Sequence, residues 1–353
     1  MDIESKLAII KSEPLEEIIT EQELRSLLET NDHPGHYIGL EISGMPHIGH
    51  LLFGGKKIND LNSIGVKTQI LLADWHTVAN RKFGADWEKI KKASEFYRKM
   101  FNVFCPGTKV VLGSDLYHEN DEYWKTVMNM AVRTTIARAT RTLIIEGRSQ
   151  TDTLHVSQYI YPIMQAADIH ALKADIPHAG MDQRRVHMLA KEIFKDLKLG
   201  PIVPIHHHLM PAMTSQLRFK EGESKEEKVA EMKMSKSKPG SFISVIATPE
   251  EIRSTINSAW CEQKVVDGNP VLMLCRYVLL PTVSKLKIER KKEHGGDIIY
   301  DNYTQLADDY RTGKLHPADL KAAVASSLAK ILEPVRKEFT GKNQELLEVF
   351  KQK

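Results

Sequence analysis

The sequence has few cysteines, no long apolar run and no excess of one charge. Its 353 residues include three cysteines, Cys105, Cys261 and Cys275, and no two of them form a C-x-x-C pair. This argues against a disulfide scaffold or a zinc ribbon, and we expect buried thiols in a reducing cytoplasm. No stretch approaches the ~18 consecutive apolar residues of a membrane helix, and the first residues lack the apolar core of a secretion signal. The net charge of +3 neither requires nor excludes a nucleic-acid partner.

The rest of the composition, 42% hydrophobic and 27% charged, is that of a globular protein long enough for two domains. Strand-like runs at 36–41, 69–73 and 110–113 alternate with helical patterns. This alternation predicts an α/β fold with a doubly wound, Rossmann-like parallel sheet covered by helices on both faces. Such sheets bind ligands at the carboxyl ends of their strands. The tail is predicted to be helical, with helices that begin at Thr248-Pro249 and His316-Pro317.

A histidine pair lies where the first of these strands gives way to a helix. The segment is His47-Ile48-Gly49-His50. The amino end of a helix offers unpaired N–H groups to a phosphate, and two imidazoles three residues apart can both donate to a triphosphate. Gly49 lets a purine approach the helix backbone, and Gly44 gives the preceding loop its conformational freedom. Two ordinary surface histidines would give the same pattern, so the motif alone does not decide.

A lysine-rich motif follows late in the chain, within a highly charged connection. It reads Lys233-Met234-Ser235-Lys236-Ser237. Lysines on a mobile loop can close over a triphosphate and stabilise the leaving pyrophosphate, while the serine hydroxyls donate to its oxygens. A solvated lysine run is the plain alternative. The two motifs together, with a strand–helix pattern between them, favour the nucleotide-binding interpretation.

These motifs give the chain a family resemblance. H-I-G-H followed by K-M-S-K-S is the signature pair of the class I aminoacyl-tRNA synthetases, and the chain resembles the tyrosine enzyme in its archaeal and eukaryotic form. The resemblance covers most of the chain through the segments YIGLEISGMPHIGH, LLADWH, YIYPIMQAADIH, GMDQRRVHMLAKE, VVDGNP, GGDIIY and LHPADLKAAVASSLAKILEPVR. It implies catalytic roles for His47, His50, Lys233 and Lys236. It implies ATP-binding roles for Gly39, Glu41, Gly44, His47, Gly49, His50, Met234, Ser235, Lys236 and Ser237.

The amino-acid site of the family has matching residues here. Tyr161, Gln165 and Asp168 are spaced i, i+4 and i+7, so a helix places them on one face among apolar neighbours. In the family, residues that match Tyr37 and Asp168 bind the phenol of the substrate. Residues that match Tyr161, Gln165 and Gln183 hold its ammonium group. A carboxylate can accept the phenolic proton, and a tyrosine hydroxyl can either donate or accept.

Contacts with RNA rest on weaker signals. A Thr-rich helical stretch carries arginines opposed only by Glu146, and the resemblance places Arg141 near the acceptor stem. It places His294 and Asp297 at the loop that reads the first anticodon base, although a turn braced by Asp297 is an alternative. Val278 stands where some relatives are expected to stack an aromatic ring on that base. The run His206-His207-His208 alternates across a strand and has no carboxylate at ligand spacing, so we predict no metal site.

The resemblance implies a tyrosine–tRNA ligase that forms tyrosyl-adenylate from L-tyrosine and ATP and transfers the tyrosine to tRNA(Tyr). No tightly bound cofactor is expected, only Mg²⁺ with ATP, and the enzyme is expected to be a cytoplasmic homodimer that does not bind membranes. The expected domains are a helical segment at 1–30, a catalytic domain at 31–220 with a dimer and acceptor-stem insertion around 110–160, a mobile loop and linker at 221–247, and an all-helical anticodon-binding domain at 248–353. Three alternatives stay open: the tryptophan enzyme, a small nucleotidylyltransferase and a non-catalytic RNA-binding paralogue.

Overall fold

The computed structural model describes residues 1–143, 155–214, 241–341 and 343–351. The chain divides into two compact units. The core unit comprises Met1–Met45, Gly54–His208 and Gly341–Lys353, and the tail unit comprises Pro46–Phe53 and Leu209–Thr340. Most of the loop and linker expected at 221–247 lies outside the described residues, which resume at 241. Within the described part of the chain, no helix is long and apolar enough to cross a membrane.

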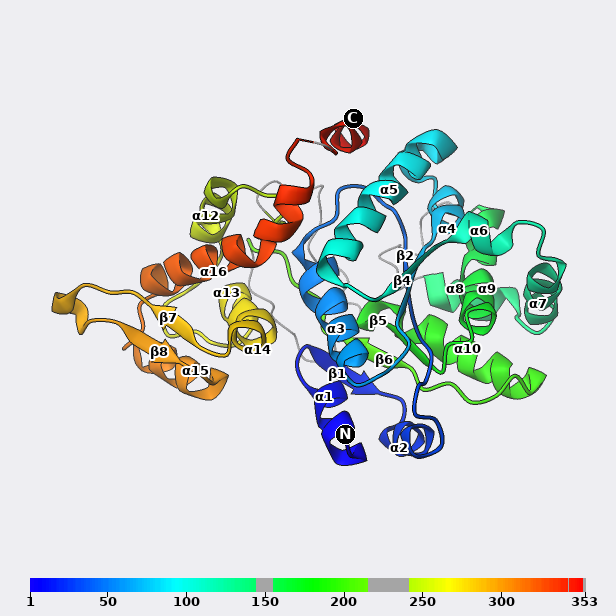
Figure 1. The fold of residues 1–353 in the computed structure, drawn as a ribbon, viewed down its shortest axis with the longest axis horizontal. Helices are drawn as coiled ribbons and strands as arrows, with labels where there is room; N and C mark the ends of the chain where they lie inside the picture. The colour runs from blue at the N-terminus through cyan, green and yellow to red at the C-terminus, as the bar shows by residue number, and fades with distance from the viewer. Residues whose placement is uncertain (144–154, 215–240, 342, 352–353) are drawn as a thin grey trace. The chain divides into compact units, whose positions relative to one another are not determined.

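The core unit is built on a six-stranded sheet (Figure 1). Five parallel strands stand in the order β6-β5-β2-β3-β4, and β1 pairs antiparallel with β6 at one edge. The three strands expected from the sequence are confirmed as β2, β3 and β4. The expected helical segment at 1–30 is corrected in one respect, because its middle forms the edge strand β1. The strand bounds are β1 Leu15–Ile18, β2 His36–Leu40, β3 Gln69–Leu72, β4 Lys109–Leu112, β5 Ile176–Gly180 and β6 Ile205–His207.

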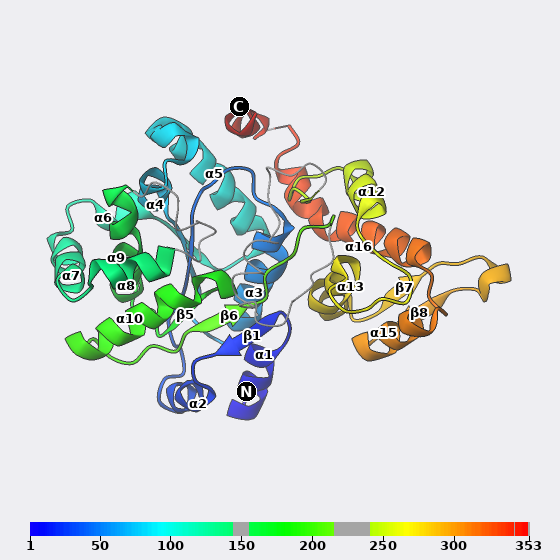
Figure 2. The ribbon, with the colours of Figure 1, turned by 180° about the vertical axis from the view of Figure 1, so that it is seen from behind.

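Helices cover both faces of this sheet, as the doubly wound prediction requires (Figure 2). Successive strand residues point to opposite faces, so Tyr37 and Leu71 enter one core with α7, α9 and α10, and Ile176 and Ile205 enter another with α1, α2 and α3. The carboxyl-terminal η6 packs on α5 through Phe350 and Phe96, whose rings are 5.1 Å apart. The helix bounds are α1 Ile3–Lys11, α2 Glu21–Thr30, η1 His50–Gly55, α3 Lys56–Ser63, α4 Asp74–Ala79, η2 Lys82–Ala85, α5 Trp87–Phe104, α6 Gly113–Tyr117, α7 Asp121–Ala131, α8 Ile136–Leu143, α9 Val156–Ala171, η3 Met181–Gln183, α10 Arg184–Leu197 and η6 Gln344–Phe350.

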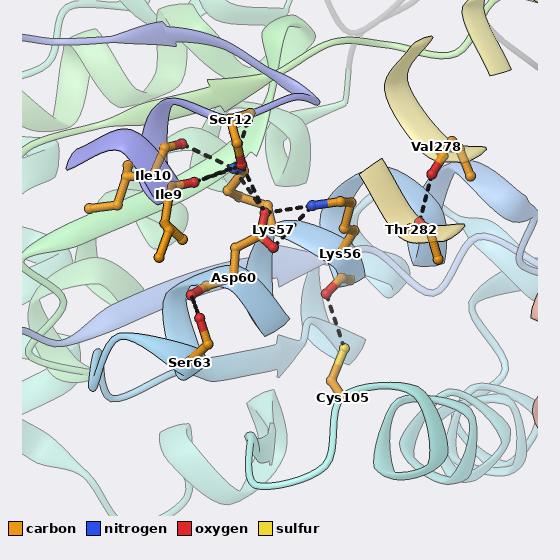
Figure 3. Close-up of polar contacts among 11 residues, drawn as sticks. Ile9, Ile10, Ser12, Lys56, Lys57, Asp60, Ser63, Cys105, Val278 and Thr282 are labelled. Carbon is orange, nitrogen blue, oxygen red and sulfur yellow. Dashed lines mark hydrogen bonds and ion pairs between the residues drawn. The ribbon is translucent and has the colours of Figure 1, made fainter. Parts of the chain in front are cut away.

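A buried lysine ties the first helix to the helix that follows the histidine motif (Figure 3). Lys57 on α3 is fully buried, and its Nζ donates to the carbonyls of Ile9, Ile10 and Ser12 at 2.7–3.2 Å. The carboxylate of Asp60 lies 3.0 Å from the same nitrogen. A cation at the carboxyl end of α1 satisfies carbonyls that lack partners within the helix. Burial lowers the pKa of Lys57 to about 8, against the opposing charge of Asp60.

The tail unit is mainly helical and contains one short antiparallel hairpin. Thr248 caps α12 and His316 caps α16, as predicted. The expectation of an all-helical tail is corrected by β7 and β8, because Leu286 and Ile288 alternate with an exposed Lys287 and pair with Tyr300 and its neighbours. The bounds are α12 Pro249–Ser258, α13 Pro270–Leu274, η4 Cys275–Leu279, α14 Leu280–Val283, β7 Leu286–Ile288, η5 Lys292–His294, β8 Ile298–Tyr300, α15 Tyr303–Thr312 and α16 Pro317–Glu338.

Candidate active site

The carboxyl ends of the parallel strands bring polar residues of the core unit to one edge of the sheet. Asp74 follows β3, and Ser114 follows β4. Asp74 Oδ1 accepts hydrogen bonds of 3.0 Å from the backbone N–H groups of Trp75 and Ser114, and the Ser114 hydroxyl bonds Oδ2. These bonds tie the two strand ends together. The side chain is buried, which raises the pKa of Asp74. Gln183 lies in η3, directly after β5, and is half-buried.

A buried carboxylate lies at the centre of the site. Asp168 on α9 has no exposed surface, and its Oδ1 accepts hydrogen bonds of 2.9 Å from the hydroxyls of Tyr117 and Tyr123. Its Oδ2 has no hydrogen-bond partner among the described residues. The nearest cationic candidate is His76, whose Nε2 is 3.6 Å from Oδ2 and beyond hydrogen-bond length. A buried carboxylate oxygen with unsatisfied lone pairs is a site for a hydrogen-bond donor from a ligand.

The electrostatics of this carboxylate are set by burial. Burial raises the pKa of Asp168 from its ordinary value of 3.8 to about 7, although the two tyrosine hydroxyls lower it. Burial also lowers the pKa of His76 to about 4, so this ring is neutral near pH 7 and does not form an ion pair with Asp168. Asp168 therefore titrates close to neutral pH, and its deprotonated form accepts a proton-bearing group well.

The residues predicted to bind the amino acid lie in the same unit. Tyr161, Gln165 and Asp168 are buried on α9, which is buried on nearly all sides. The rings of His76 and Tyr161 are nearly perpendicular, with centroids 4.5 Å apart. Tyr37 on β2 is buried, and both burial and the charge of Asp168 raise the pKa of its hydroxyl. Gly39 lies under this side chain, because a Cβ there would be 2.4 Å from the Tyr37 hydroxyl. Gly39 is thus required by the position of Tyr37.

Two residues assigned to the ATP site from the sequence also belong to the core unit. Glu41 follows β2 and bonds the side-chain amide of Asn80, with Lys82 at 3.9 Å. Gly44 has a φ of 137°, a value that side chains rarely adopt, and its carbonyl accepts a hydrogen bond of 2.8 Å from the Tyr97 hydroxyl. The loop before the histidine motif therefore has a fixed shape that favours glycine.

The histidine motif belongs to the tail unit and pairs with the chain that follows the lysine motif. His47 bridges Ser244, and the Ile48 N–H donates to the Ile243 carbonyl at 3.0 Å. The rings of His47 and His50 are 4.2 Å apart. Both rings accept a backbone N–H at Nδ1, from Gly49 at 3.1 Å and from His47 at 3.2 Å. For His47 this arrangement favours the tautomer with the proton on Nε2, from which a neutral imidazole can donate to a phosphate. His50 Nδ1 also lies 3.3 Å from the His47 carbonyl, so the contacts of His50 fit either tautomer.

Gly49 is also explained by the structure, because a Cβ there would be 2.8 Å from the His47 ring. The lysine motif itself lies outside the described residues. Its five residues, predicted to act on ATP, are Lys233, Met234, Ser235, Lys236 and Ser237.

The residues predicted to contact RNA differ in their surroundings. Arg141 on α8 is exposed. Its neighbour Arg138 is paired with Glu192 at 2.6 Å, so the expectation that Glu146 alone opposes these arginines is wrong. Glu192 comes from α10, and its approach to α8 was not visible in the sequence. Glu146 lies outside the described residues.

In the tail unit, His294 is exposed next to Gly295 and Gly296, both with positive φ. Asp297 is engaged on both oxygens. Its Oδ1 accepts the Arg290 N–H at 3.1 Å, and its Oδ2 is 2.9 Å from Lys287 Nζ. This arrangement supports the alternative interpretation of the sequence, in which Asp297 braces a turn.

Val278 has no exposed surface, so it does not occupy a surface position where a base would stack. Its side chain is part of the core of the tail unit, and its correspondence to the aromatic position of some relatives stays a prediction.

The consecutive histidines of β6 have separate partners. His207 Nδ1 is 2.8 Å from His178 Nε2, and His206 Nε2 is 3.0 Å from His187 Nδ1. His206 also contacts Glu17 at 3.1 Å, and this hydrogen bond is the main cause that lowers the pKa of Glu17 to about 2. In the described part of the chain, no three His, Cys, Asp or Glu side chains are placed to hold a metal ion.

Four buried residues of the site were not assigned from the sequence. They are Asp74, His76, Tyr117 and Tyr123. Asp74 and His76 lie in the LLADWH segment directly after a predicted strand, and this position at a strand's carboxyl end could have assigned them to the site. Tyr117 and Tyr123 are brought to Asp168 by α6 and α7, and nothing in their spacing indicated this contact.

Comparison with known proteins defines the class. The family model described as "tRNA synthetases class I (W and Y)" matches residues 29–333. The chain therefore belongs to the class I tRNA synthetases of the tryptophan and tyrosine group.

Relatives named tyrosine--tRNA ligase resemble it over its whole length. The protein from Pyrobaculum arsenaticum is 41% identical over 99% of this chain and 98% of its own, and the one from Thermococcus kodakarensis is 40% identical over 100% and 99%. The crystal structure of the Pyrococcus horikoshii tyrosyl-tRNA synthetase complexed with L-tyrosine matches with a TM-score of 0.89 and 37% identity, over 99% of this chain and 100% of that one. The Plasmodium falciparum tryptophanyl-tRNA synthetase, at 15% identity and a TM-score of 0.68 over 99% and 90%, shares the fold alone.

Proposed function

We propose that this chain is a tyrosine–tRNA ligase, which activates L-tyrosine with ATP and transfers it to the terminal adenosine of tRNA(Tyr). The observation that carries this proposal is the buried Oδ2 of Asp168, which has no hydrogen-bond partner among the described residues. A phenol donates to this oxygen through its O–H and accepts from the hydroxyl of Tyr37. An indole N–H could donate to the same oxygen but could not accept from Tyr37, so the pair favours tyrosine over tryptophan. The named relatives at about 40% identity support the same assignment.

The other end of the amino acid is assigned to neighbouring groups. We propose that Tyr161, Gln165 and Gln183 hold the ammonium group. Gln165 Oε1 is buried and has no hydrogen-bond partner among the described residues, which suits an N–H donor from a ligand. An ammonium group, with three donors, is such a ligand.

The activation step follows from charge. The ionised carboxylate of tyrosine attacks the α-phosphate of ATP in line, the bond between the α- and β-phosphates breaks, and pyrophosphate leaves. We propose that His47 and His50 donate to the developing charge through Nε2 and that Lys233 and Lys236 stabilise the leaving pyrophosphate. Gly39, Glu41, Gly44 and Gly49 would line the nucleotide, and Mg²⁺ would enter as the complex with ATP. In the second step a ribose hydroxyl of the tRNA attacks the adenylate carbonyl and releases AMP.

The domains and partners are part of the proposal. The core unit, with the histidine motif, would be catalytic, and the tail unit from α12 onward would bind the anticodon through the hairpin loop that holds His294 and Asp297. Arg141, which is exposed, would meet the acceptor stem. A homodimer is supported by large apolar side chains exposed on α7–α9 and the turn between α7 and α8, at the predicted insertion: Met128, Val132, Ile136, Val156 and Ile160. A cytoplasmic location is consistent with three free cysteines.

The amino-acid assignment is tested by Asp168→Ala. Tyrosine-specific synthetases are the standard example of a site that rejects an analogue lacking a hydroxyl, and as a class they reject phenylalanine by ~10⁴–10⁵-fold. We expect the variant to keep ATP binding and to lose this preference in pyrophosphate exchange. Asp309→Ala is a matched control, because Asp309 also accepts a tyrosine hydroxyl, that of Tyr300 at 2.9 Å, in the tail unit. If Asp168→Ala still shows no pyrophosphate exchange with phenylalanine, Asp168 does not bind the phenol.

A further inference from the structure

Two tyrosines outside the family's substrate-binding set are built around Asp168. We propose that the hydroxyls of Tyr117 and Tyr123 act as a fixed donor pair on Oδ1 of Asp168, which positions the carboxylate and leaves Oδ2 as its acceptor for the substrate phenol. Both hydroxyls lie 2.9 Å from the same oxygen. The inference rests on the proposed function. It identifies the residues that hold the carboxylate of Asp168, the group proposed to select tyrosine.

The two rings are immobilised by aromatic neighbours. Tyr117 and Tyr123 are stacked, with centroids 4.5 Å apart and planes inclined by 29°. Trp124 packs its edge against Tyr123 at 5.3 Å, and Trp75 packs against Tyr117 at 5.7 Å. The Trp124 indole N–H donates to the Tyr117 carbonyl at 3.2 Å. Gly113 leaves room for the Tyr117 ring, since a Cβ there would be 2.9 Å from it. The donors are therefore placed before any ligand arrives.

The geometry separates the roles of the two carboxylate oxygens. Each phenol has a single O–H to donate, and both are directed to Oδ1. The Tyr123 hydroxyl also contacts the hydroxyl of Tyr117 and, at a longer distance of 3.5 Å, the Met164 carbonyl. Burial and the charge of Asp168 raise the pKa of both tyrosines, so they remain protonated donors at every physiological pH. The lone pairs of Oδ2 are then the remaining acceptors toward His76 and Tyr37.

The charges around Asp168 make the pair necessary. Burial raises the pKa of Asp168, and Asp74, from the start of α4, raises it further. His76, also on α4, is neutral near pH 7 because its pKa is about 4, and Tyr37 on β2 carries no positive charge. Among the groups that act on Asp168, the hydroxyls of Tyr123 and Tyr117 are the two that lower its pKa. Without them the carboxylate would be protonated over a wider pH range, and its acceptor strength toward a phenol would fall.

The experiment measures tyrosine-dependent pyrophosphate exchange from pH 6 to 9 in the parent, Tyr117→Phe, Tyr123→Phe and the double variant. Tyr300→Phe is the matched control, because it removes a buried hydroxyl that donates to Asp309 in the tail unit. We expect the acid limb of kcat/KM, which lies near pH 7 in the parent, to move upward by at least one pH unit in the double variant. This is about a tenfold loss in the acid limb, largely recovered at pH 9, with smaller displacements in the single variants.

A merely structural role for the tyrosines would lower kcat/KM equally at all pH values and leave the midpoint in place. That result, with Tyr300→Phe behaving as the parent, would overturn the inference. The carboxyl ¹³C resonance of Asp168, assigned with Asp168→Asn, gives a second readout without substrate, and its midpoint should also move upward in the double variant. If the parent shows no tyrosine-dependent exchange, the proposed function fails, while this carboxyl midpoint still decides whether the pair acts on Asp168.

Discussion

Replacing Asp168 by asparagine should stabilise the protein at alkaline pH while it exchanges the carboxylate proposed to accept the phenol for a neutral amide. The pKa of Asp168 rises from 3.8 to about 7 in the folded chain because the carboxyl is buried. Between these values the unfolded chain has lost its proton and the folded chain has kept it, so the free energy of unfolding falls as pH rises. Above pH 7 the full penalty is present. Because a tenfold change in an equilibrium constant corresponds to about 1.36 kcal/mol, the penalty reaches about 4 kcal/mol.

Asparagine has the same shape and no charge, so it escapes this penalty. We expect the difference in unfolding free energy between Asp168→Asn and the parent to grow by about 2.5 kcal/mol between pH 5 and pH 8. Groups other than Asp168 titrate in both proteins and cancel. Urea denaturation followed by tryptophan fluorescence suits the measurement, because Trp75 and Trp124 lie against Tyr117. A difference that does not change with pH would refute the reasoning, since Asp168 would then have an ordinary pKa.

Three further predictions concern other parts of the chain. Lys57→Met should destabilise the core unit by about 1–3 kcal/mol, because it leaves the carbonyls at the end of α1 without their buried cation, while Asp60 keeps its ion pair with Lys56; the rise of the parent's unfolding free energy between pH 8 and 10 should be lost with it. Lys236→Ala should slow adenylate formation in single-turnover kinetics far more than it raises KM for tyrosine; an unchanged rate with a raised KM would contradict this. Asp297→Ala should leave pyrophosphate exchange unchanged. If its charging of tRNA keeps the parent's preference for guanine at the first anticodon position, Asp297 only braces the hairpin with Arg290 and Lys287.

Local signals predicted much of the fold. The helices that begin at Thr248-Pro249 and His316-Pro317 form as expected, and so do the strands at 36–41, 69–73 and 110–113. These features depend on residues close in sequence, and the structure confirms them. The edge strand β1 was missed because Leu15–Ile18 is short and becomes a strand only by pairing with β6, about 190 residues later. The hairpin β7–β8 is local, and it was missed because Leu286–Ile288 and Ile298–Tyr300 are each too short to show a clear alternating pattern.

The site shows the same division between local and distant contacts. The i, i+4, i+7 spacing of Tyr161, Gln165 and Asp168 predicted one buried face, and the structure places all three there. The donors to Asp168 could not be found in this way, because Tyr117 and Tyr123 lie on different helices, 51 and 45 residues away in sequence. Asp297 was assigned from a sequence match, and the structure revealed its partners.

Amino-acid-dependent exchange of pyrophosphate into ATP, measured on the unaltered protein with tyrosine, tryptophan, phenylalanine and no amino acid, tests the central claim most directly. The assay needs no tRNA and reports only activation, the step assigned to the carboxylate of Asp168 and to the two signature motifs. We predict rapid exchange with tyrosine and exchange near the background with the other three. Exchange that is faster with tryptophan would assign the protein to the other branch of the family, and exchange without any amino acid or with none of the three would contradict the proposed activation chemistry.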